Sequence, residues 1–216
     1  MLALPTDRDG DGDLDVFVGS DRARDGRPPA AFWRNDGGSW TNDASEIGAD
    51  LHNDAMGVAA ADFDGDGDRD YCMSDLSDQL TCLLAVDGGY VEGASSLGLV
   101  AHPDNEPGHA TGGAWSPWSV EALDLDNDGR IDVAAPAGPP PGPGGLDDGV
   151  FNRSQPDALW QGSAGGFLER TWDLGFGDPA PHYGLASADL DGDGFRELIL
   201  GSWDGPAVLW DNPCGP

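Results

Sequence analysis

Apolar and polar residues alternate in short runs along the chain, and no segment shows the periodicity of an amphipathic helix. The runs are separated by glycine, proline, asparagine and aspartate, which favour turns, so they are typical of short β-strands. The same order of runs recurs four times. We expect first strands at 57–61 and 184–188, second strands at 14–19, 71–74, 131–135 and 198–201, third strands at 30–34, 80–86, 158–160 and 207–210, and fourth strands beginning at Trp40, Tyr90 and Phe167.

A nine-residue acidic loop stands between the first and second predicted strands of each unit. It carries acids at positions 1, 3, 5 and 9, glycine at position 6 and a variable residue at position 7. The acids are Asp7, Asp9, Asp11 and Asp15; Asp62, Asp64, Asp66 and Asp70; Asp124, Asp126, Asp128 and Asp132; and Asp189, Asp191, Asp193 and Glu197. Position 7 is Asp13, Asp68, Arg130 or Phe195.

These loops predict one Ca²⁺ site per repeat, about four in all. Alternate carboxylates on a tight turn can converge on a hard cation, and Ca²⁺ accepts about six to eight oxygens. We expect position 7 to contribute its backbone carbonyl, which explains why its side chain varies. An EF-hand is excluded because it needs an acid at position 12, where this chain has Val18, Met73, Ala135 or Leu200. Mg²⁺ is disfavoured because it prefers few protein ligands and retains water.

Repeated four-stranded units predict an all-β fold, a β-propeller of about four blades in a single domain over residues 1–216. The approximate units are 1–52, 53–110, 111–182 and 183–216. The first begins almost at its loop, and the last ends after its third strand. Three arrangements remain open: a closed four-bladed ring, an arc of a larger ring, or an assembly in which another copy supplies the missing strand.

The net charge of the chain limits the classes of partner that it can bind. The net charge of −30 makes nucleic-acid binding improbable, because phosphate contacts need a basic surface. Four bound Ca²⁺ would cancel eight of these charges, and without them each loop holds several like charges close together. No apolar run is long enough to cross a bilayer, and no secretory leader is recognisable in these residues.

The acidic loops resemble those of FG-GAP/VCBS repeats, the calcium-loop propeller blades of integrin α chains and many secreted bacterial proteins. Residues 61–70 and 188–194 carry the closest match, and residues 32–38 with Trp40 and Thr41 are similar to the outer hairpin of cartilage acidic protein-like members. The resemblance covers nearly the whole chain. It implies a propeller with one Ca²⁺ per blade and an extracellular or cell-surface location.

The tryptophans and cysteines are candidates for packing, for a binding surface or for a disulfide. Trp33, Trp160 and Trp210 occupy equivalent third-strand positions, which indicates packing between blades, whereas Trp115 and Trp118 break the repeat and are candidates for a binding surface. A disulfide between Cys72 and Cys82 is plausible across a predicted hairpin, and leaves Cys214 over.

We expect the four histidines on connectors at the face opposite the calcium loops. These are His52, His102, His109 and His182. The proline- and glycine-rich insertion at 136–156 is expected as a surface loop on that same face, with a glycosylation sequon at Asn152.

These observations favour a non-enzymatic, Ca²⁺-stabilised extracellular module for binding, adhesion or self-assembly. Its partner would be a protein, a glycan or further copies of the chain, bound on the histidine-bearing face. No nucleophile–base arrangement is visible, so no catalytic residue is predicted. The alternatives are a polysaccharide-acting enzyme or a glycan-binding lectin with its site on that same face.

Overall fold

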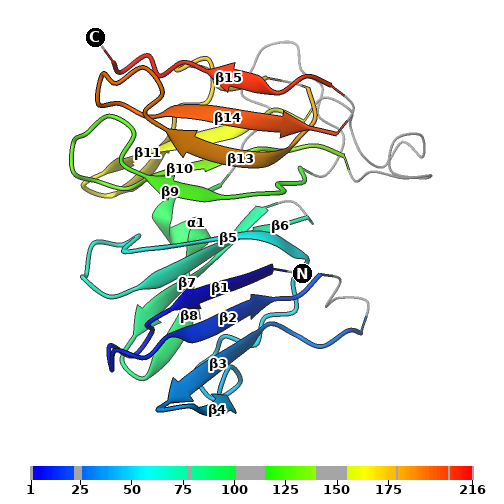
Figure 1. Cartoon of the computed structure of the whole chain (residues 1–216), viewed down its shortest axis with the longest axis vertical. Coiled ribbons are helices and arrows are strands. Elements are labelled where there is room, and N and C mark those ends of the chain that lie inside the picture. Colours follow the sequence, from blue (N-terminus) through cyan, green and yellow to red (C-terminus); the bar gives the residue numbers. More distant parts are fainter. Residues whose placement is uncertain are drawn as a thin grey trace.

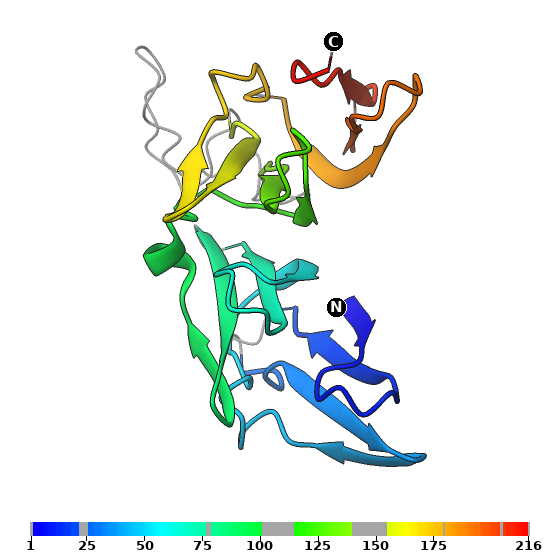
Figure 2. The ribbon, with the colours of Figure 1, turned by 90° about the vertical axis from the view of Figure 1, so that its left-hand side faces the viewer.

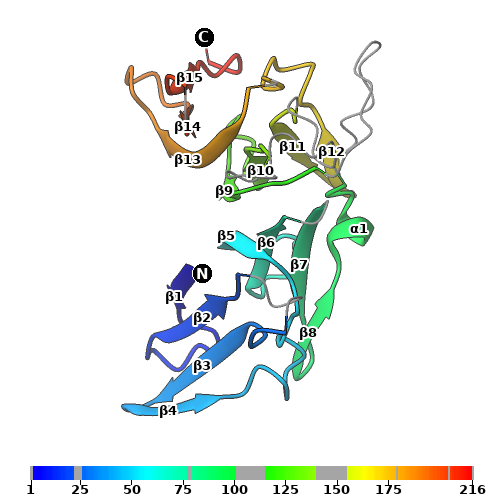
Figure 3. The ribbon, with the colours of Figure 1, turned by 90° about the vertical axis from the view of Figure 1, so that its right-hand side faces the viewer.

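The computed structural model describes residues 2–21, 26–76, 79–100, 115–139, 155–178, 180–203 and 205–215. They form four separate antiparallel sheets, placed one after another along an arc (Figure 1). The strand nearest the inside of the arc comes first in each sheet, and the later strands lie progressively outward (Figure 3). The all-β prediction is therefore confirmed.

Each sheet is a simple meander in which consecutive strands pair. Sheet 1 contains β1 (Leu2–Thr6), β2 (Asp15–Gly19), β3 (Ala31–Asp36) and β4 (Ser39–Asn42). Sheet 2 contains β5 (Ala55–Ala61), β6 (Asp70–Asp75), β7 (Gln79–Val86) and β8 (Gly89–Glu92). Sheet 3 contains β9 (Glu121–Leu123), β10 (Asp132–Ala135), β11 (Ala158–Ser163) and β12 (Gly166–Glu169). Sheet 4 contains β13 (His182–Ala188), β14 (Glu197–Ser202) and β15 (Val208–Trp210).

The ends of the repeat series differ in part from the prediction. Sheet 1 is complete, because Leu2–Thr6 forms its first strand. The sequence did not indicate this strand. Sheet 4 has three described strands, as predicted. Sheets 1 and 4 lie at opposite ends of an open arc, so the described residues do not form a closed four-bladed ring (Figure 2).

Three apolar clusters hold neighbouring sheets together, one at each junction. Phe17 and Phe32 of sheet 1 pack on Tyr71 and Met73 of sheet 2. The junction of sheets 2 and 3 has Cys72 and Cys82 on one side and Trp160 on the other. Sheets 3 and 4 meet through a third cluster of leucines and aromatic rings. Small residues on the inner strands allow close approach: a Cβ at Gly57 would lie 2.6 Å from the Ser119 Cα.

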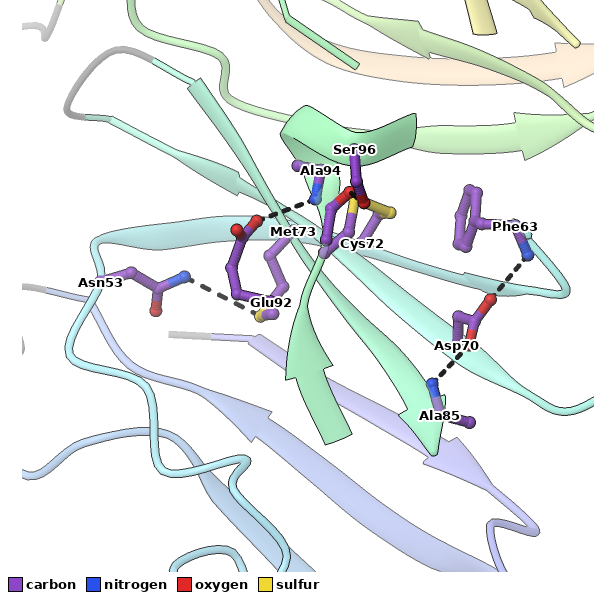
Figure 4. Close-up of a disulfide and its surroundings, with 11 residues drawn as sticks. Asn53, Phe63, Asp70, Cys72, Met73, Ala85, Glu92, Ala94 and Ser96 are labelled. Carbon is purple, nitrogen blue, oxygen red and sulfur yellow. Dashed lines mark hydrogen bonds between the residues drawn. A yellow bond between two sulfur atoms is a disulfide. The ribbon is translucent and has the colours of Figure 1, made fainter. Parts of the chain in front are cut away.

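The disulfide that the sequence left open is present. Cys72 of β6 lies directly opposite Cys82 of β7, and the two sulfur atoms are bonded (Figure 4). Both cysteines are fully buried on the face of sheet 2 that contacts sheet 3. The one described helix, α1 (Ala94–Leu97), is a single turn that ends at the left-handed Gly98. Among the described residues, no helix has the length and apolarity needed to traverse a membrane.

Candidate metal-binding loops

The four acidic loops connect the first and second strands of the four sheets, and all lie along one edge of the arc (Figure 1). We number them loop 1 (residues 7–15), loop 2 (62–70), loop 3 (124–132) and loop 4 (189–197). The opposite edge of each sheet carries the start of its first strand. The loops thus place most of the clustered negative charge on one side of the molecule.

The loops share one backbone conformation, which explains their glycines. Positions 4 and 6 have positive φ in every loop, and only glycine adopts this region without a Cβ penalty. These residues are Gly10 and Gly12, Gly65 and Gly67, Asn127 and Gly129, and Gly192 and Gly194. Asn127, with φ 58°, is the only non-glycine residue with positive φ in the described part of the chain. Asparagine is one of the few other residues that tolerate this conformation.

Backbone amides within each loop orient its acidic side chains. In loop 2, Gly65 and Gly67 donate to the two oxygens of Asp62 at 2.8 and 3.0 Å. Loop 4 repeats the pattern, where Gly192 and Gly194 donate to Asp189 at 2.7 and 3.1 Å. The position 5 carboxylate accepts from the position 7 amide in all four loops. The loops therefore present oriented carboxylates before any cation binds.

Each loop brings three carboxylate oxygens within 4.8 Å of one another. Ligands on opposite sides of a Ca²⁺ ion are about 5 Å apart, since each bond is about 2.3–2.6 Å. The converging acids are Asp7, Asp9 and Asp11; Asp62, Asp64 and Asp66; Asp124, Asp126 and Asp132; and Asp189, Asp191 and Glu197. The donor set is all oxygen and highly charged, so the residues fit Ca²⁺ on both spacing and chemistry.

The acid at position 9 differs from the others because it is buried. Asp15, Asp70 and Asp132 are at most 1% exposed, and Glu197 is 4% exposed. In loop 2, Asp70 accepts hydrogen bonds from the amides of Phe63 at 2.8 Å and Ala85 at 2.7 Å (Figure 4). Asp15 and Asp132 make the same two bonds in their own sheets. This carboxylate therefore links the start of the loop to the third strand of the sheet through two hydrogen bonds.

Burial also changes the ionisation of these acids. It raises the pKa of Asp132 to about 6, against two backbone hydrogen bonds that lower it, and Asp126 and Asp128 raise it further. Burial likewise raises the pKa of Asp70. The charged form is thus disfavoured by the protein alone, and a cation beside it would restore the carboxylate.

Position 7 side chains lie outside the converging sets, as expected if only the backbone is used. Asp13 accepts from the Gly37 amide at 2.8 Å, and Arg130 pairs with Asp128. Coordination by the carbonyls of Asp13, Asp68, Arg130 and Phe195 stays a prediction. The position 9 acid joins the converging set in loops 3 and 4 only.

A pocket of about 910 Å³ lies beside loop 2, between sheets 2 and 3. Residues 62–65 form one wall, and Arg130 and the turn between β11 and β12 form the other. Its apolar part includes Phe63 and Phe167, whose ring centroids are 6.3 Å apart. The predicted ligand surface was on the opposite face, so sequence reasoning did not indicate this pocket, which depends on the spacing of two sheets.

The prediction that all four histidines lie on connectors is wrong for His182. This residue is the first of β13 and not part of a connector, and it is fully buried. Its Nδ1 lies 2.7 Å from Asp157 Oδ2. Burial alone would lower the pKa of His182, but the hydrogen bond and negative charge of Asp157 outweigh it and raise the pKa above its ordinary value. His52 is exposed, and His102 and His109 lie outside the described residues.

Two tryptophans expected at a binding surface are also explained by packing. Trp115 is 2% exposed and meets Trp160 edge-to-face, while Trp118 donates its indole N–H to the Gly138 carbonyl. The described ends of the insertion, residues 136–139 and 155–156, are buried and not on the surface as predicted. Its middle, including Asn152, lies outside the described residues. Asp157 was missed, because nothing in its local sequence indicates a distant histidine partner.

Comparison with protein families identifies the loop pattern. Residues 7–73 match the family model of an FG-GAP-like repeat. The match includes loops 1 and 2, the strand β2 and the first four residues of β6, and it confirms the resemblance for this part of the chain. The FG-GAP-like repeat thus begins at the first predicted metal ligand. A comparison with curated proteins gave no match.

Two solved structures match this chain with low scores. A fucose lectin from Kordia zhangzhouensis, in complex with methyl-fucoside, has a TM-score of 0.42 at 16% identity, over 77% of this chain and 96% of that one. The V. cholerae biofilm matrix protein Bap1 has a TM-score of 0.44 at 18% identity, over 95% of this chain and 29% of that one. This chain therefore spans less than a third of Bap1. At these scores we carry no residue role or activity from either protein to this chain.

Proposed function

We propose that the protein is a non-enzymatic, Ca²⁺-stabilised extracellular module that binds a glycan or protein ligand. The observation that carries the proposal is the set of four loops of one conformation, each with three carboxylate oxygens within 4.8 Å. Like charges so close together oppose folding unless a cation neutralises them. In every loop, the residues that would hold Ca²⁺ include the acids at positions 1, 3, 5 and 9. The position 9 acid is an aspartate in loops 1, 2 and 3, and it is Glu197 in loop 4.

Two further observations support an extracellular location. The Cys72–Cys82 disulfide is typical of oxidising compartments. Sites of this kind, with several exposed carboxylates, fill at the millimolar Ca²⁺ of extracellular fluid without needing the tight affinity of intracellular sensors. When bound, the ion supplies positive charge that holds the loop acids together.

The pocket beside loop 2 is the proposed ligand site. Its lining combines Asp62, Asp64, Arg130 and the β11–β12 turn with the small exposed parts of Phe63 and Phe167, which are otherwise buried. Such a mixture of apolar surface and a few polar groups suits a sugar, whose ring has an apolar face and hydroxyl edges. Calcium in loop 2 would fix the wall that carries Asp62 and Asp64.

The enzyme alternative would depend on the Asp157–His182 pair, which has the hydrogen bond of a base and its orienting acid. Both side chains are buried, at 0% and 1% exposure, so a substrate has no access to them in this conformation. We therefore propose that the pair is a structural brace between the start of β11 and the start of β13.

Calcium binding is tested by titrating the apo protein with Ca²⁺ in a calorimeter. We expect about four sites with dissociation constants of about 10–100 µM, and much weaker heats with Mg²⁺. The Asp64→Ala and Asp191→Ala variants should each lose one site. A protein that binds no Ca²⁺ at millimolar concentration would contradict the proposal.

The pocket is tested separately with a printed glycan array in Ca²⁺. Gly165 has open space around it, so Gly165→Trp should block the pocket without disturbing the fold. Leu168→Trp, on exposed β12 but outside the pocket lining, is the matched control. We expect binding that is lost with Gly165→Trp and retained with Leu168→Trp. Equal binding by both variants would show that the pocket is not the site.

A further inference from the structure

The two ends of the arc expose sheet faces that are buried everywhere else in the molecule. Sheets 2 and 3 each have one face toward the preceding sheet and one toward the following sheet, whereas in the described residues sheet 1 packs only on sheet 2 and sheet 4 only on sheet 3. We call the first face of sheet 1 the leading face, defined by Val16, Val18, Trp33 and Trp40. We call the second face of sheet 4 the trailing face, defined by Ala186, Ile199 and Leu209. None of these residues belongs to the three core clusters.

The strand register identifies the buried counterparts of the leading face. Trp33 lies opposite Val16 across β3 and β2, as Trp160 lies opposite Val133 across β11 and β10. Trp160 and Val133 are 0% exposed at the junction of sheets 2 and 3, whereas Trp33 is 41% exposed. Trp40 has the position of Phe167, which is 8% exposed, yet Trp40 is 50% exposed. The same residue types are thus buried in sheet 3 and uncovered in sheet 1.

The trailing face has buried counterparts of the same kind. Ile199 and Leu209 are neighbours across β14 and β15. The equivalent pairs are Phe17–Phe32, Cys72–Cys82 and Ala134–Leu159, and each of these residues is 0% exposed. Ile199 is 37% exposed and Leu209 is 57% exposed. A face that packs against a following sheet at all three internal junctions is therefore open in sheet 4.

Each face gathers large apolar side chains on adjacent strands. In a chain with a net charge of −30, Trp33 and Trp40 are exposed on the leading face, and Ile199 and Leu209 are exposed as direct neighbours on the trailing face. Neighbouring exposed apolar residues mark an interaction site more than single ones do.

We propose that the leading face of one copy packs on the trailing face of a second copy, head to tail. At every internal junction a leading face meets a trailing face, so the two end faces are unmatched halves of an interface that the molecule already builds three times. A contact between two leading faces would bring Trp33 and Trp40 against their own copies, an arrangement that no internal junction uses. The complement of each face is present at the other end of this same chain, so the occupant that we propose is a second copy.

Head-to-tail contact between unlike faces closes into a ring or grows as an open series. It differs from the predicted addition of a strand at the edge of sheet 4, because it uses sheet faces and leaves the β15 edge unpaired. The inference goes beyond the proposed function, since neither face includes a loop acid or a residue of the pocket. Ca²⁺ and moderate salt should strengthen the contact by reducing repulsion between acidic copies.

The test is sedimentation velocity in Ca²⁺ at about 1–100 µM protein, a range that spans the dissociation constants of weak and standard interfaces. We expect species of twice the 22.4 kDa chain mass or larger. Trp33→Lys should disrupt the leading face and Leu209→Lys the trailing face, and each should shift the protein to monomer. Val18→Lys and Ile199→Lys provide a second substitution on each face.

Leu168→Lys is the matched control, since Leu168 and Leu209 are both 57% exposed but only Leu209 lies at an end of the arc. Circular dichroism in Ca²⁺ checks that each variant is folded. Mixing Trp33→Lys with Leu209→Lys should restore dimers, because one intact leading face can meet one intact trailing face. The proposal is overturned by a wild type that stays monomeric at about 100 µM, by a Trp33→Lys variant that associates normally, or by a mixture that remains monomeric.

Discussion

The two edges of the sheets treat negative charge in opposite ways. Along the loop edge, exposed carboxylates converge on one another, and backbone amides of the same loop orient many of them. Arg130 pairs with one loop acid, Asp128. At the opposite edge, Asp157 is buried and the chain supplies its own basic partner, His182. At one edge the chain itself supplies the countercharge, whereas at the other edge the proposed function assigns that part to Ca²⁺ from solution.

Removing divalent cations should have the largest effect, and should act only on the loop edge. At millimolar Ca²⁺ and dissociation constants of about 10–100 µM, each site adds roughly 1.5–3 kcal/mol. Four such sites are comparable with the total stability of a domain, about 5–15 kcal/mol. We expect a chelator to lower Tm by more than about 10 °C in differential scanning calorimetry. A shift of about one or two degrees would mean that the loops do not depend on metal.

Variants of a buried and an exposed acid of loop 2 distinguish the hydrogen bonds of Asp70 from the cation site. Asp70→Ala leaves the buried amide of Phe63 and the half-buried amide of Ala85 without an acceptor, which should cost about 2–4 kcal/mol with or without Ca²⁺. Asp64→Ala should reduce stability in Ca²⁺ but not in chelator. Urea unfolding in both buffers measures this difference. If Asp70→Ala loses its effect in chelator, the residue acts through the ion alone.

The Cys72–Cys82 disulfide joins the middle of β6 to the middle of β7, so its contribution to stability is a reference that should not depend on Ca²⁺. Its ten-residue separation predicts a loss of about 2–3 kcal/mol in the Cys72→Ala, Cys82→Ala double variant. The loss in urea unfolding should be the same in Ca²⁺ and in chelator. A loss confined to Ca²⁺ would link the disulfide to the metal sites and would weaken the division between the edges.

The Asp157–His182 pair should give the smallest effect, and its sign is set by pH. The pKa of His182 is raised in the folded protein, so the pair stabilises the fold below the ordinary pKa of histidine, and this contribution is lost as pH rises through the raised value. Burial raises the pKa of Asp157 to about 6, which acts in the same direction. The Tm difference between wild type and His182→Gln should shrink by on the order of a few degrees between pH 5.5 and pH 8.5. A difference that grows with pH would show that the pair has no such role.

Much of the loop geometry could be predicted because it is local. Nine consecutive residues contain the acids, the glycines and the turn, so the chain identifies each loop without distant contacts. The hairpin register that pairs Cys72 with Cys82 also follows from a short segment. The burial of the position 9 acid was missed, because it depends on an amide in the third strand, such as that of Ala85.

Contacts between sheets could not be predicted in the same way. Trp33 and Trp160 have equivalent positions in the repeat, yet one is half exposed and the other buried, because only Trp160 has a preceding sheet against it. Trp115 was a candidate for a binding surface and His182 was expected on a connector, but both are buried against segments far away in sequence.

The sequence by itself determined the strand order, the four acidic loops and the chemistry that they can offer a cation, since these features depend on spacing within a few residues. Only the tertiary structure decided that the four sheets form an open arc, that a pocket lies between sheets 2 and 3, and that two apolar faces remain uncovered. The physical reason is that burial depends on which sheets become neighbours and at what angle, and these relations are not encoded in any one repeat.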